Sequence, residues 1–277
     1  MTPARPSSRR SVLAGGRHVH VLDAGDGEPV VLLHGIAGSI ASWAPLVPVL
    51  ARTRRVVALD LPGFGRSEPL AGDVRTGTLA GAVATTLDVL GIAQGAIGGQ
   101  SLGGIVALHL ALARPDLVSS LVVISAGYAF AIPPEDDPSR RGHVPGTLRL
   151  LAPTSVDDAA ALLALVLDDP SRAANPAAIE EVFRAHASSA PACNALVASF
   201  GRREDALDGR LDGVRSLTLV VAGASDRFTP PSLSERLAAA IPGARLAVIA
   251  HAGHAPAAER PAELLALVEA HLHVRPS

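Results

Sequence analysis

A short glycine-flanked serine segment is the part of this sequence best suited to covalent chemistry. Residues 99–103 read Gly-Gln-Ser-Leu-Gly, the G-x-S-x-G pattern of a serine held on a sharp turn between a strand and a helix. A short strand-like run, 93–99, precedes Ser101, and a helical run, 102–112, follows it. Such a turn crowds its flanking positions, so glycine is needed there, and it lifts the hydroxyl to a helix N-terminus. The pattern therefore predicts Ser101 as a nucleophile.

Two residues later in the chain are suited to activate that serine. Asp226 lies a few residues after the strand-like segment 217–221, and His254 follows the strand-like segment 245–249. The chain order Ser, Asp, His is the order of a nucleophile, an orienting acid and a general base on a parallel sheet. Because the loops after parallel strands meet at one edge of the sheet, we expect these three side chains to converge.

Each of the two partners has a rival. Asp60 also follows a strand-like segment, but its Leu-Pro-Gly-Phe-Gly surroundings are typical of a structural loop, which favours Asp226. His251 lies close to His254, and the Gly253 and Pro256 that flank the latter favour it on an exposed loop. Seven further histidines show no metal-ligand spacing beyond i, i+2 pairs, so no metal site is predicted: His18, His20, His109, His143, His186, His271 and His273.

Backbone N–H groups are expected to stabilise the negative charge that forms when a serine attacks a carbonyl group. Leu102 begins the helix after the serine, so its N–H has no partner inside that helix. The tight turn after the strand-like segment 29–33 points a second donor, the N–H of Ile36, into the same cleft. The side chains that are candidates for the substrate pocket are Gln100, His34 and Tyr128. Of these, His34 is better suited to hold its loop by hydrogen bonding than to titrate.

The elements that must hold these residues alternate along the chain. Apolar runs typical of strands buried on both faces of a parallel sheet occur at 29–33, 55–59, 93–99, 121–124, 217–221 and 245–249. Helical spacing is found at 78–90, 102–112, 231–240 and 261–271. A hairpin pattern at 11–22 precedes them all. This order predicts an α/β fold with a mostly parallel sheet.

The alternation of strands and helices stops between 128 and 209, where only helical spacing is found. The helical segments there are 156–167, 176–187 and 192–200. We therefore expect a disordered tail at 1–10, a core at 11–127 and 210–277, and a helical insertion at 128–209.

Composition excludes several other kinds of chemistry. All 24 basic residues are arginine, so the chain has no lysine for a phosphate-binding loop, a Schiff base or a Ser–Lys pair. Cys193 is the only cysteine, which excludes an intrachain disulfide and favours a small buried side chain at that position. The net charge of −2 gives no reason to expect nucleic acid as a partner.

The segment Ser8-Arg9-Arg10 has the look of a twin-arginine export signal. The apolar stretch and cleavage site of such a signal do not follow; Gly15, Gly16 and an alternating run follow instead. We therefore interpret the segment as a chance match and predict a cytoplasmic protein. No apolar stretch approaches the ~18 residues of a membrane span, so no transmembrane helix is predicted.

Several strings in the chain resemble the α/β-hydrolase fold-1 family: LLHGIAGSIASW, ALDLPGFGRSEP, GGQSLGG, VAGASDRFTP and HAGHAPAAERPAEL. The resemblance extends from about residue 12 to 272 and leaves only the helical insertion without an identifying motif. The resemblance implies a mostly parallel eight-stranded sheet, an insertion that forms a lid (cap) over the active site, and no cofactor. It also implies Ser101, Asp226 and His254 as a catalytic triad, with Ile36 and Leu102 as oxyanion donors.

Departures from particular relatives narrow this expectation. A serine at 101 is unlike epoxide hydrolases and haloalkane dehalogenases, which use aspartate there. Meta-cleavage C–C hydrolases usually carry an aromatic residue directly after the catalytic histidine, whereas Ala255 and Pro256 follow His254 here. Gln100 stands where many relatives have histidine.

The sequence therefore predicts a serine hydrolase that cleaves a carboxylic ester, or a related acyl compound, through an acyl-enzyme intermediate. The Ala, Leu and Val content of the insertion favours a small, apolar or neutral substrate. The arginine pairs at 140–141 and 202–203 are interpreted as solvated surface. Hydrolysis of a C–C bond, lactone or thioester, and acyl transfer to another acceptor, use the same triad and stay open. A receptor that binds a small molecule without turnover is an alternative of another class.

Overall fold

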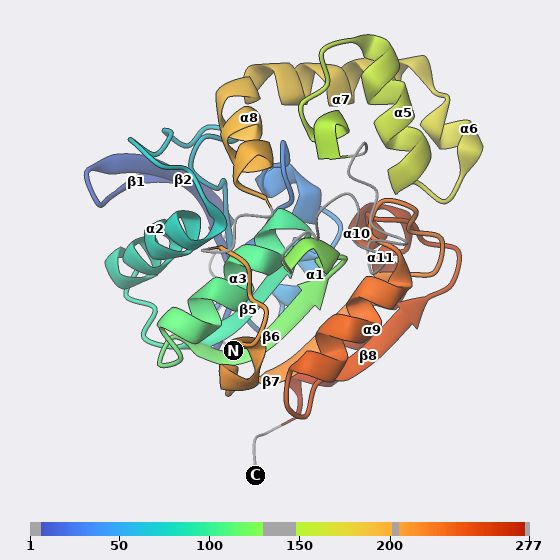
Figure 1. Cartoon of the computed structure of the whole chain (residues 1–277). Helices are drawn as coiled ribbons and strands as arrows, with labels where there is room; N and C mark the ends of the chain where they lie inside the picture. The colour runs from blue at the N-terminus through green and yellow to red at the C-terminus, as the bar shows by residue number, and fades with distance from the viewer. Residues whose placement is uncertain (1–6, 130–147, 201–204, 275–277) are drawn as a thin grey trace.

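An eight-stranded sheet forms the centre of the computed structural model, which describes residues 7–129, 148–200 and 205–274 (Figure 1). The strands are β1 (Ser8–Ala14), β2 (Arg17–Ala24), β3 (Pro29–Leu33), β4 (Arg55–Leu59), β5 (Gly95–Gln100), β6 (Val118–Ile124), β7 (Leu217–Gly223) and β8 (Arg245–Ile249). They lie in the order β1-β2-β4-β3-β5-β6-β7-β8. The β1–β2 and β2–β4 pairs are antiparallel and the other pairs are parallel. The mostly parallel sheet of the prediction is confirmed.

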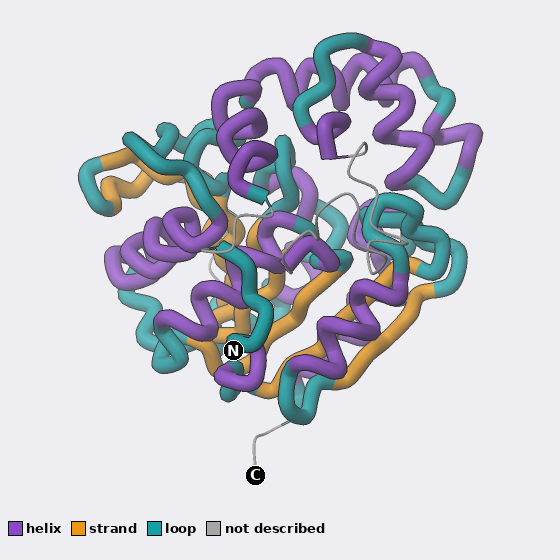
Figure 2. Tube along the Cα trace, viewed as in Figure 1, coloured by secondary structure: helices purple, strands orange, loops and turns teal. Residues whose placement is uncertain are grey.

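Alternate residues of each central strand pack into two separate apolar layers. Val31 and Leu33 face the layer that contains the helices α2 (Thr76–Val89), α3 (Leu102–Ala113) and α9 (Pro231–Ala240). Val30 and Leu32 face the layer that contains η1 (Ile40–Trp43), α1 (Val47–Leu50) and α11 (Pro261–Leu272). Burial on both faces explains why these strands are apolar runs without alternation. Figure 2 shows the helices gathered around the strands.

The first strand begins earlier than expected. Residues 8–10, which the sequence places in a disordered tail, belong to β1 and pair with β2, so the expected tail is too long. Ser8 and Arg10 both bond to Asp23 on β2, which extends the hairpin beyond its apolar part. Because this edge strand is mostly exposed, its outer half has no apolar alternation to indicate a strand.

Between β6 and β7 the chain leaves the sheet and forms a group of helices that lies over one end of it (Figure 1). The elements between the two strands are η2 (Gly127–Ala129), η4 (Arg149–Leu151), α5 (Val156–Val166), α6 (Pro170–Ala173), α7 (Pro176–Ser188), α8 (Ala190–Ser199) and η5 (Leu211–Gly213). Of these, α5 to α8 form the group (Figure 1), whereas η2 contacts α9 and η5 contacts α3. The helices predicted at 156–167, 176–187 and 192–200 are thus present as α5, α7 and α8. The arginine pairs at 140–141 and 202–203 lie outside the described residues.

The core ends with β8, the short helix α10 (Pro256–Glu259) and α11. Within the ranges that the structure describes, no helix is both long and apolar enough to cross a membrane.

Candidate active site

Ser101 occupies a strained turn between β5 and α3. Its φ is 52° and its ψ −119°, a backbone conformation that costs energy for any residue with a side chain. It is the N-cap of α3, so its hydroxyl lies at the positive end of a helix dipole. The backbone N–H of Ser101 donates to the carbonyl oxygen of Ile124, 2.8 Å away, which ties the turn to β6.

The glycines around Ser101 are required by close backbone packing. A side chain at Gly99 would overlap the carbonyl group of Gly103. One at Gly103 would overlap the carbonyl group of Leu33 on β3, and one at Gly104 would bring its Cβ to 2.7 Å from the Cβ of Ala126. Glycine is therefore required at these positions of the turn, because a larger residue would not fit without moving the sheet.

Asp226 lies on the loop after β7, with a side chain that is almost fully buried. Its Oδ1 accepts hydrogen bonds from the backbone N–H of Phe228 (3.0 Å) and of Thr229 (2.7 Å). Its Oδ2 accepts a hydrogen bond from Thr229 Oγ1 at 2.6 Å. These donors compensate the burial of the carboxylate and fix the direction of its second oxygen.

His254 completes this arrangement from the loop after β8. Its Nδ1 lies 2.8 Å from Asp226 Oδ2 and 3.1 Å from Thr229 Oγ1. Because a carboxylate can only accept, Nδ1 carries the proton of this bond and Nε2 is left as a basic nitrogen. The ring also packs edge-to-face against Phe228, with centroids 5.1 Å apart. The pair is therefore oriented by contacts on two sides.

Ser101 and His254 line the same cavity, which has a volume of about 140 Å³. The apolar part of its wall comes largely from the helical insertion, through Leu151, Leu162, Leu163, Val166 and Val182, and Phe228 on the loop after β7 completes it. A smaller cavity of about 10 Å³ shares Ser101, Ile36, Leu151 and Phe228 with the first. Among the described residues, no arginine, aspartate or glutamate lines either cavity.

The two expected oxyanion donors lie next to the serine. Leu102 is the first residue of α3 and lines the smaller cavity, whereas Ile36 lines both cavities. The preceding residue, Gly35, is so close that a Cβ there would lie 3.3 Å from the Cβ of Ser101. The loop after β3 thus passes directly over the hydroxyl-bearing residue.

The three pocket candidates differ in their environment. Gln100 lines the larger cavity, and its Nε2 donates to the carbonyl oxygen of His254 at 3.2 Å. His34 is fully buried: its Nδ1 donates to the carbonyl oxygen of Gly35 (2.6 Å) and its Nε2 accepts from the N–H of Leu61 (2.9 Å). Burial lowers its pKa. The expectation that His34 lines the pocket is therefore wrong, whereas its interpretation as a loop support fits. Tyr128 lies in η2, with a side chain outside the described part of the structure.

The rival residues have other roles. Asp60 is buried and accepts hydrogen bonds from the backbone N–H groups of Ile40 (2.7 Å) and Arg66 (2.9 Å), so it joins two loops. His251 is exposed on the loop before His254, with φ 53°. Cys193 is buried in the apolar layer, and burial raises the pKa of its thiol to about 12, which leaves no reactive thiolate at neutral pH.

Sequence reasoning missed two residues near the site. Thr229 bonds to both members of the Asp226–His254 pair, and only its position three residues after the aspartate could have indicated it. His186, on α7, lines the larger cavity, and its Nδ1 donates to the carbonyl oxygen of Val182 at 2.9 Å. Its Nε2 is buried without a hydrogen-bond partner among the described residues, and burial lowers the pKa of the ring.

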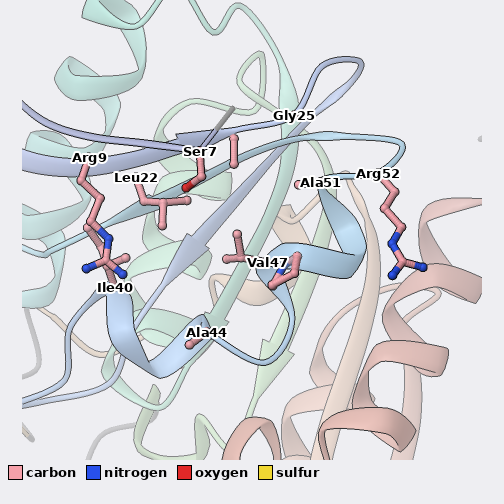
Figure 3. A pocket seen from close by; sticks show the side chains of 11 residues that line it. Ser7, Arg9, Leu22, Gly25, Ile40, Ala44, Val47, Ala51 and Arg52 are labelled. Atoms are coloured by element: carbon pink, nitrogen blue, oxygen red, sulfur yellow. The ribbon is translucent and has the colours of Figure 1, made fainter. Parts of the chain in front are cut away.

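A third cavity, of about 440 Å³, lies apart from the two that Ser101 lines, between β2, η1 and α1 (Figure 3). Its wall is mainly apolar, with Arg9 and Arg52 as its only charged side chains within the described ranges. It contains neither a histidine nor a carboxylate, so it offers no acid–base pair. In the same ranges, no group of three or more His, Cys, Asp or Glu residues is placed to hold a metal ion.

Comparison with known proteins shows what this chain is similar to. A family model described as alpha/beta hydrolase fold matches residues 28–261. The chain is 32% identical to 2-hydroxymuconate semialdehyde hydrolase of Pseudomonas sp. (strain CF600), over 95% of this chain and 93% of that protein. It is also 32% identical, over 90% of its length, to the dihydrolipoyllysine-residue acetyltransferase component of the acetoin cleaving system of Cupriavidus necator, of which it spans only 64%. Among solved structures, a thermophilic esterase from Thermogutta terrifontis matches with a TM-score of 0.79 at 25% identity, over 96% of this chain and 98% of that one.

Proposed function

Because the chain belongs to the α/β-hydrolase family, we propose that it is a serine hydrolase that cleaves small carboxylic esters through Ser101, His254 and Asp226. The observation that carries the proposal is the 2.8 Å hydrogen bond between Asp226 and His254, beside a cavity that Ser101 also lines. The basic Nε2 left by that bond is the group that a serine nucleophile needs as a proton acceptor.

The reaction follows from these groups. His254 Nε2 accepts the proton of Ser101 while Oγ attacks the ester carbonyl carbon, and Asp226 stabilises the imidazolium that forms. The N–H groups of Ile36 and Leu102 bind the oxyanion. The tetrahedral intermediate collapses, and the alcohol leaves with the proton from His254. Water then attacks the acyl-enzyme with the same histidine as base, which releases the acid and restores Ser101.

The substrate class is inferred from the cavity. Its volume of about 140 Å³ is small, and its described wall combines leucine, valine and phenylalanine side chains with no fixed positive charge. Such a wall favours a short, neutral, largely apolar group, because a carboxylate would be desolvated there without a counter-ion. Since six of the lining residues come from η4, α5 and α7, we also infer that the insertion at 128–209 acts as a lid and specificity element.

Hydrolysis of a C–C bond is the second candidate. It is favoured by the 32% identity to 2-hydroxymuconate semialdehyde hydrolase over nearly the whole chain. The same serine, histidine and aspartate serve both reactions, so a substrate panel must separate them. A vinylogous diketone of the kind that C–C hydrolases cleave should be turned over at least ~100-fold more slowly, in kcat/KM, than p-nitrophenyl butyrate if the ester proposal holds.

The export motif bears on location. Arg9 and Arg10 belong to β1 and pair with β2, so they are part of the folded sheet. This placement supports the interpretation of Ser8-Arg9-Arg10 as a chance match, and the cytoplasmic location stays a prediction.

The decisive experiment compares Ser101→Ala with Ser188→Ala, which removes an exposed serine from α7. With p-nitrophenyl acetate and butyrate, we expect the first variant to lose ~10⁴-fold or more in kcat and the second to keep it. A fluorophosphonate should label the wild type at Ser101 alone. Near-normal turnover by a folded Ser101→Ala protein would refute the proposal. Binding of small esters by the wild type without turnover or labelling would favour the receptor alternative.

A further inference from the structure

The C-terminal end of α5 rests on the two loops that carry Asp226 and His254. This helix supplies Leu162, Leu163 and Val166 to the wall of the cavity that Ser101 and His254 line. A helix leaves its last carbonyl groups without partners inside the helix, so those of α5 must find donors elsewhere. The donors they find come from the core of the molecule, not from the insertion itself.

Arg227, the residue after Asp226, supplies most of these donors. Its guanidinium donates to the carbonyl oxygen of Ala164 through Nε (3.1 Å) and Nη2 (2.6 Å). The same Nη2 lies 2.7 Å from the carbonyl oxygen of Leu167, and the backbone N–H of Arg227 donates to Leu165 at 3.2 Å. A cation at a helix C-terminus also opposes the negative end of the helix dipole. One residue of the acid loop thus caps the end of α5.

The base loop holds the same helix end. The backbone N–H of His254 donates to the carbonyl oxygen of Val166 at 2.6 Å. The buried Glu259 accepts from the N–H groups of Asp168 (2.8 Å) and Gly253 (3.0 Å), which joins the residues after α5 to the histidine loop. A side chain at Gly253 would overlap the carbonyl oxygen of Val166, so the two segments touch through their backbones.

We propose that Arg227 is a positioning residue, which fixes α5 as a rigid wall of the substrate cavity in register with the Asp226–His254 pair. The inference rests on the proposed ester hydrolysis and adds to it a determinant of chain-length preference. Only the part of a substrate that reaches α5 depends on this anchor. The attack of Ser101 on the carbonyl carbon does not, because β5 and α3 hold the serine.

The test compares Arg227→Ala and Arg227→Lys with Arg184→Ala. Arg184 is an exposed arginine on α7 that pairs with Glu180, so its removal is a matched loss of one positive charge at a position outside α5 and the Asp226 loop. Steady-state constants are measured with p-nitrophenyl acetate and butyrate. We expect Arg227→Ala to raise KM for the butyrate ester about tenfold, the effect of one charge-assisted hydrogen bond, and to change kcat and the acetate constants less than threefold.

Arg227→Lys should recover part of the loss in KM, since an ammonium group can still donate to one of the two carbonyl oxygens. Hydrogen exchange gives a readout that does not depend on activity: amides of α5 should exchange faster in Arg227→Ala, and those of α7 should not. Equal losses for the two esters, no rescue by lysine, or unchanged exchange in α5 would overturn the anchor. A wild-type protein with no ester turnover would overturn the proposed function instead, while the exchange result would still decide whether Arg227 holds α5.

Discussion

Two buried pairs of aspartate and histidine lie at the carboxyl ends of the parallel strands, and in the described part of the structure only one of them reaches the cavity that Ser101 lines. Asp60 and His34 follow β4 and β3, whereas Asp226 and His254 follow β7 and β8. Each carboxylate accepts hydrogen bonds from two backbone N–H groups. The residue types and their place at the sheet edge are therefore the same in the two regions.

The histidines make the difference. Both ring nitrogens of His34 bond to backbone groups, one to Gly35 in its own loop and one to Leu61 in the loop after β4, and its side chain has no exposed surface. His254 uses Nδ1 for Asp226 and lines the cavity with the rest of its ring. An Asp–His pair at this edge can thus be a structural support or an acid–base system. The ring nitrogen that remains unused decides which of the two it is.

The largest expected effect separates the two aspartates. Asp226→Asn should lower kcat for p-nitrophenyl acetate by ~10⁴-fold with the fold retained, because an amide no longer selects the histidine tautomer that leaves Nε2 basic. Asp60→Asn, measured in parallel, should keep kcat within about threefold, since no reacting atom contacts that loop. Comparable losses of kcat in the two folded variants would show that the structural pair also takes part in catalysis.

The next effect concerns stability, for which Asp60 is expected to matter although it does not affect kcat. Asp60→Ala leaves the buried N–H group of Ile40 and the partly buried N–H group of Arg66 without their acceptor, so we expect the free energy of unfolding to fall by about 3 kcal/mol. Urea denaturation followed by circular dichroism measures this change. Asp60→Asn keeps one oxygen acceptor and should lose about half as much. A loss below about 1 kcal/mol for the alanine variant would contradict the assigned supporting role.

A smaller effect on kcat is expected from the hydroxyl group of Thr229, which contacts Asp226 and His254. Thr229→Val removes the donor to Asp226 and the contact with His254 at nearly constant volume. We expect kcat to fall about tenfold, the value of one hydrogen bond of about 1.4 kcal/mol to a charged group. Thr229→Ser keeps the hydroxyl and should retain most of the activity. If the valine variant matches the wild type, the backbone donors alone orient the carboxylate.

The smallest effect is the pH dependence contributed by His34. Burial lowers its pKa below the ordinary 6.5, so the unfolded chain binds a proton at a pH where the folded protein does not. Its contribution to stability is therefore fully present above pH 6.5 and is lost as the pH falls below that value, by at most ~1.4 kcal/mol per pH unit. His34→Gln can keep an acceptor for Leu61 and should flatten the fall in unfolding free energy between pH 6.5 and 5. An unchanged slope would mean that other buried histidines dominate.

Local patterns were sufficient for the central sheet and for the elbow. Runs such as Val30–Leu33 are apolar because both faces of each strand are buried, and the glycines beside Ser101 are fixed by direct backbone contact. Each constraint restricts the residue types of a few consecutive positions, whichever segment packs against them, so the sequence displays it. The outer half of β1 lacked such a signal because its residues are exposed and polar.

Contacts between distant segments could not be foreseen in this way. Arg227 meets the end of α5 across 63 positions of the chain, and Glu259 meets Asp168 across 91. An arginine or a glutamate in a loop is compatible with many partners, and no periodicity indicates which carbonyl or N–H it meets. His34 was assigned to the pocket for the same reason: its position after a strand indicates the sheet edge but not the side on which the ring is buried.

The contacts of the C-terminal end of α5 with the Asp226 and His254 loops also limit which insertions and deletions homologues of this protein can tolerate. One residue inserted into or deleted from α5 would turn its end by about 100° and point its last carbonyl groups away from Arg227 and His254. Homologous enzymes with new substrates should therefore keep the length of this helix and vary its side chains. Changes in chain length should accumulate from α6 to α8, where they leave these contacts of α5 intact.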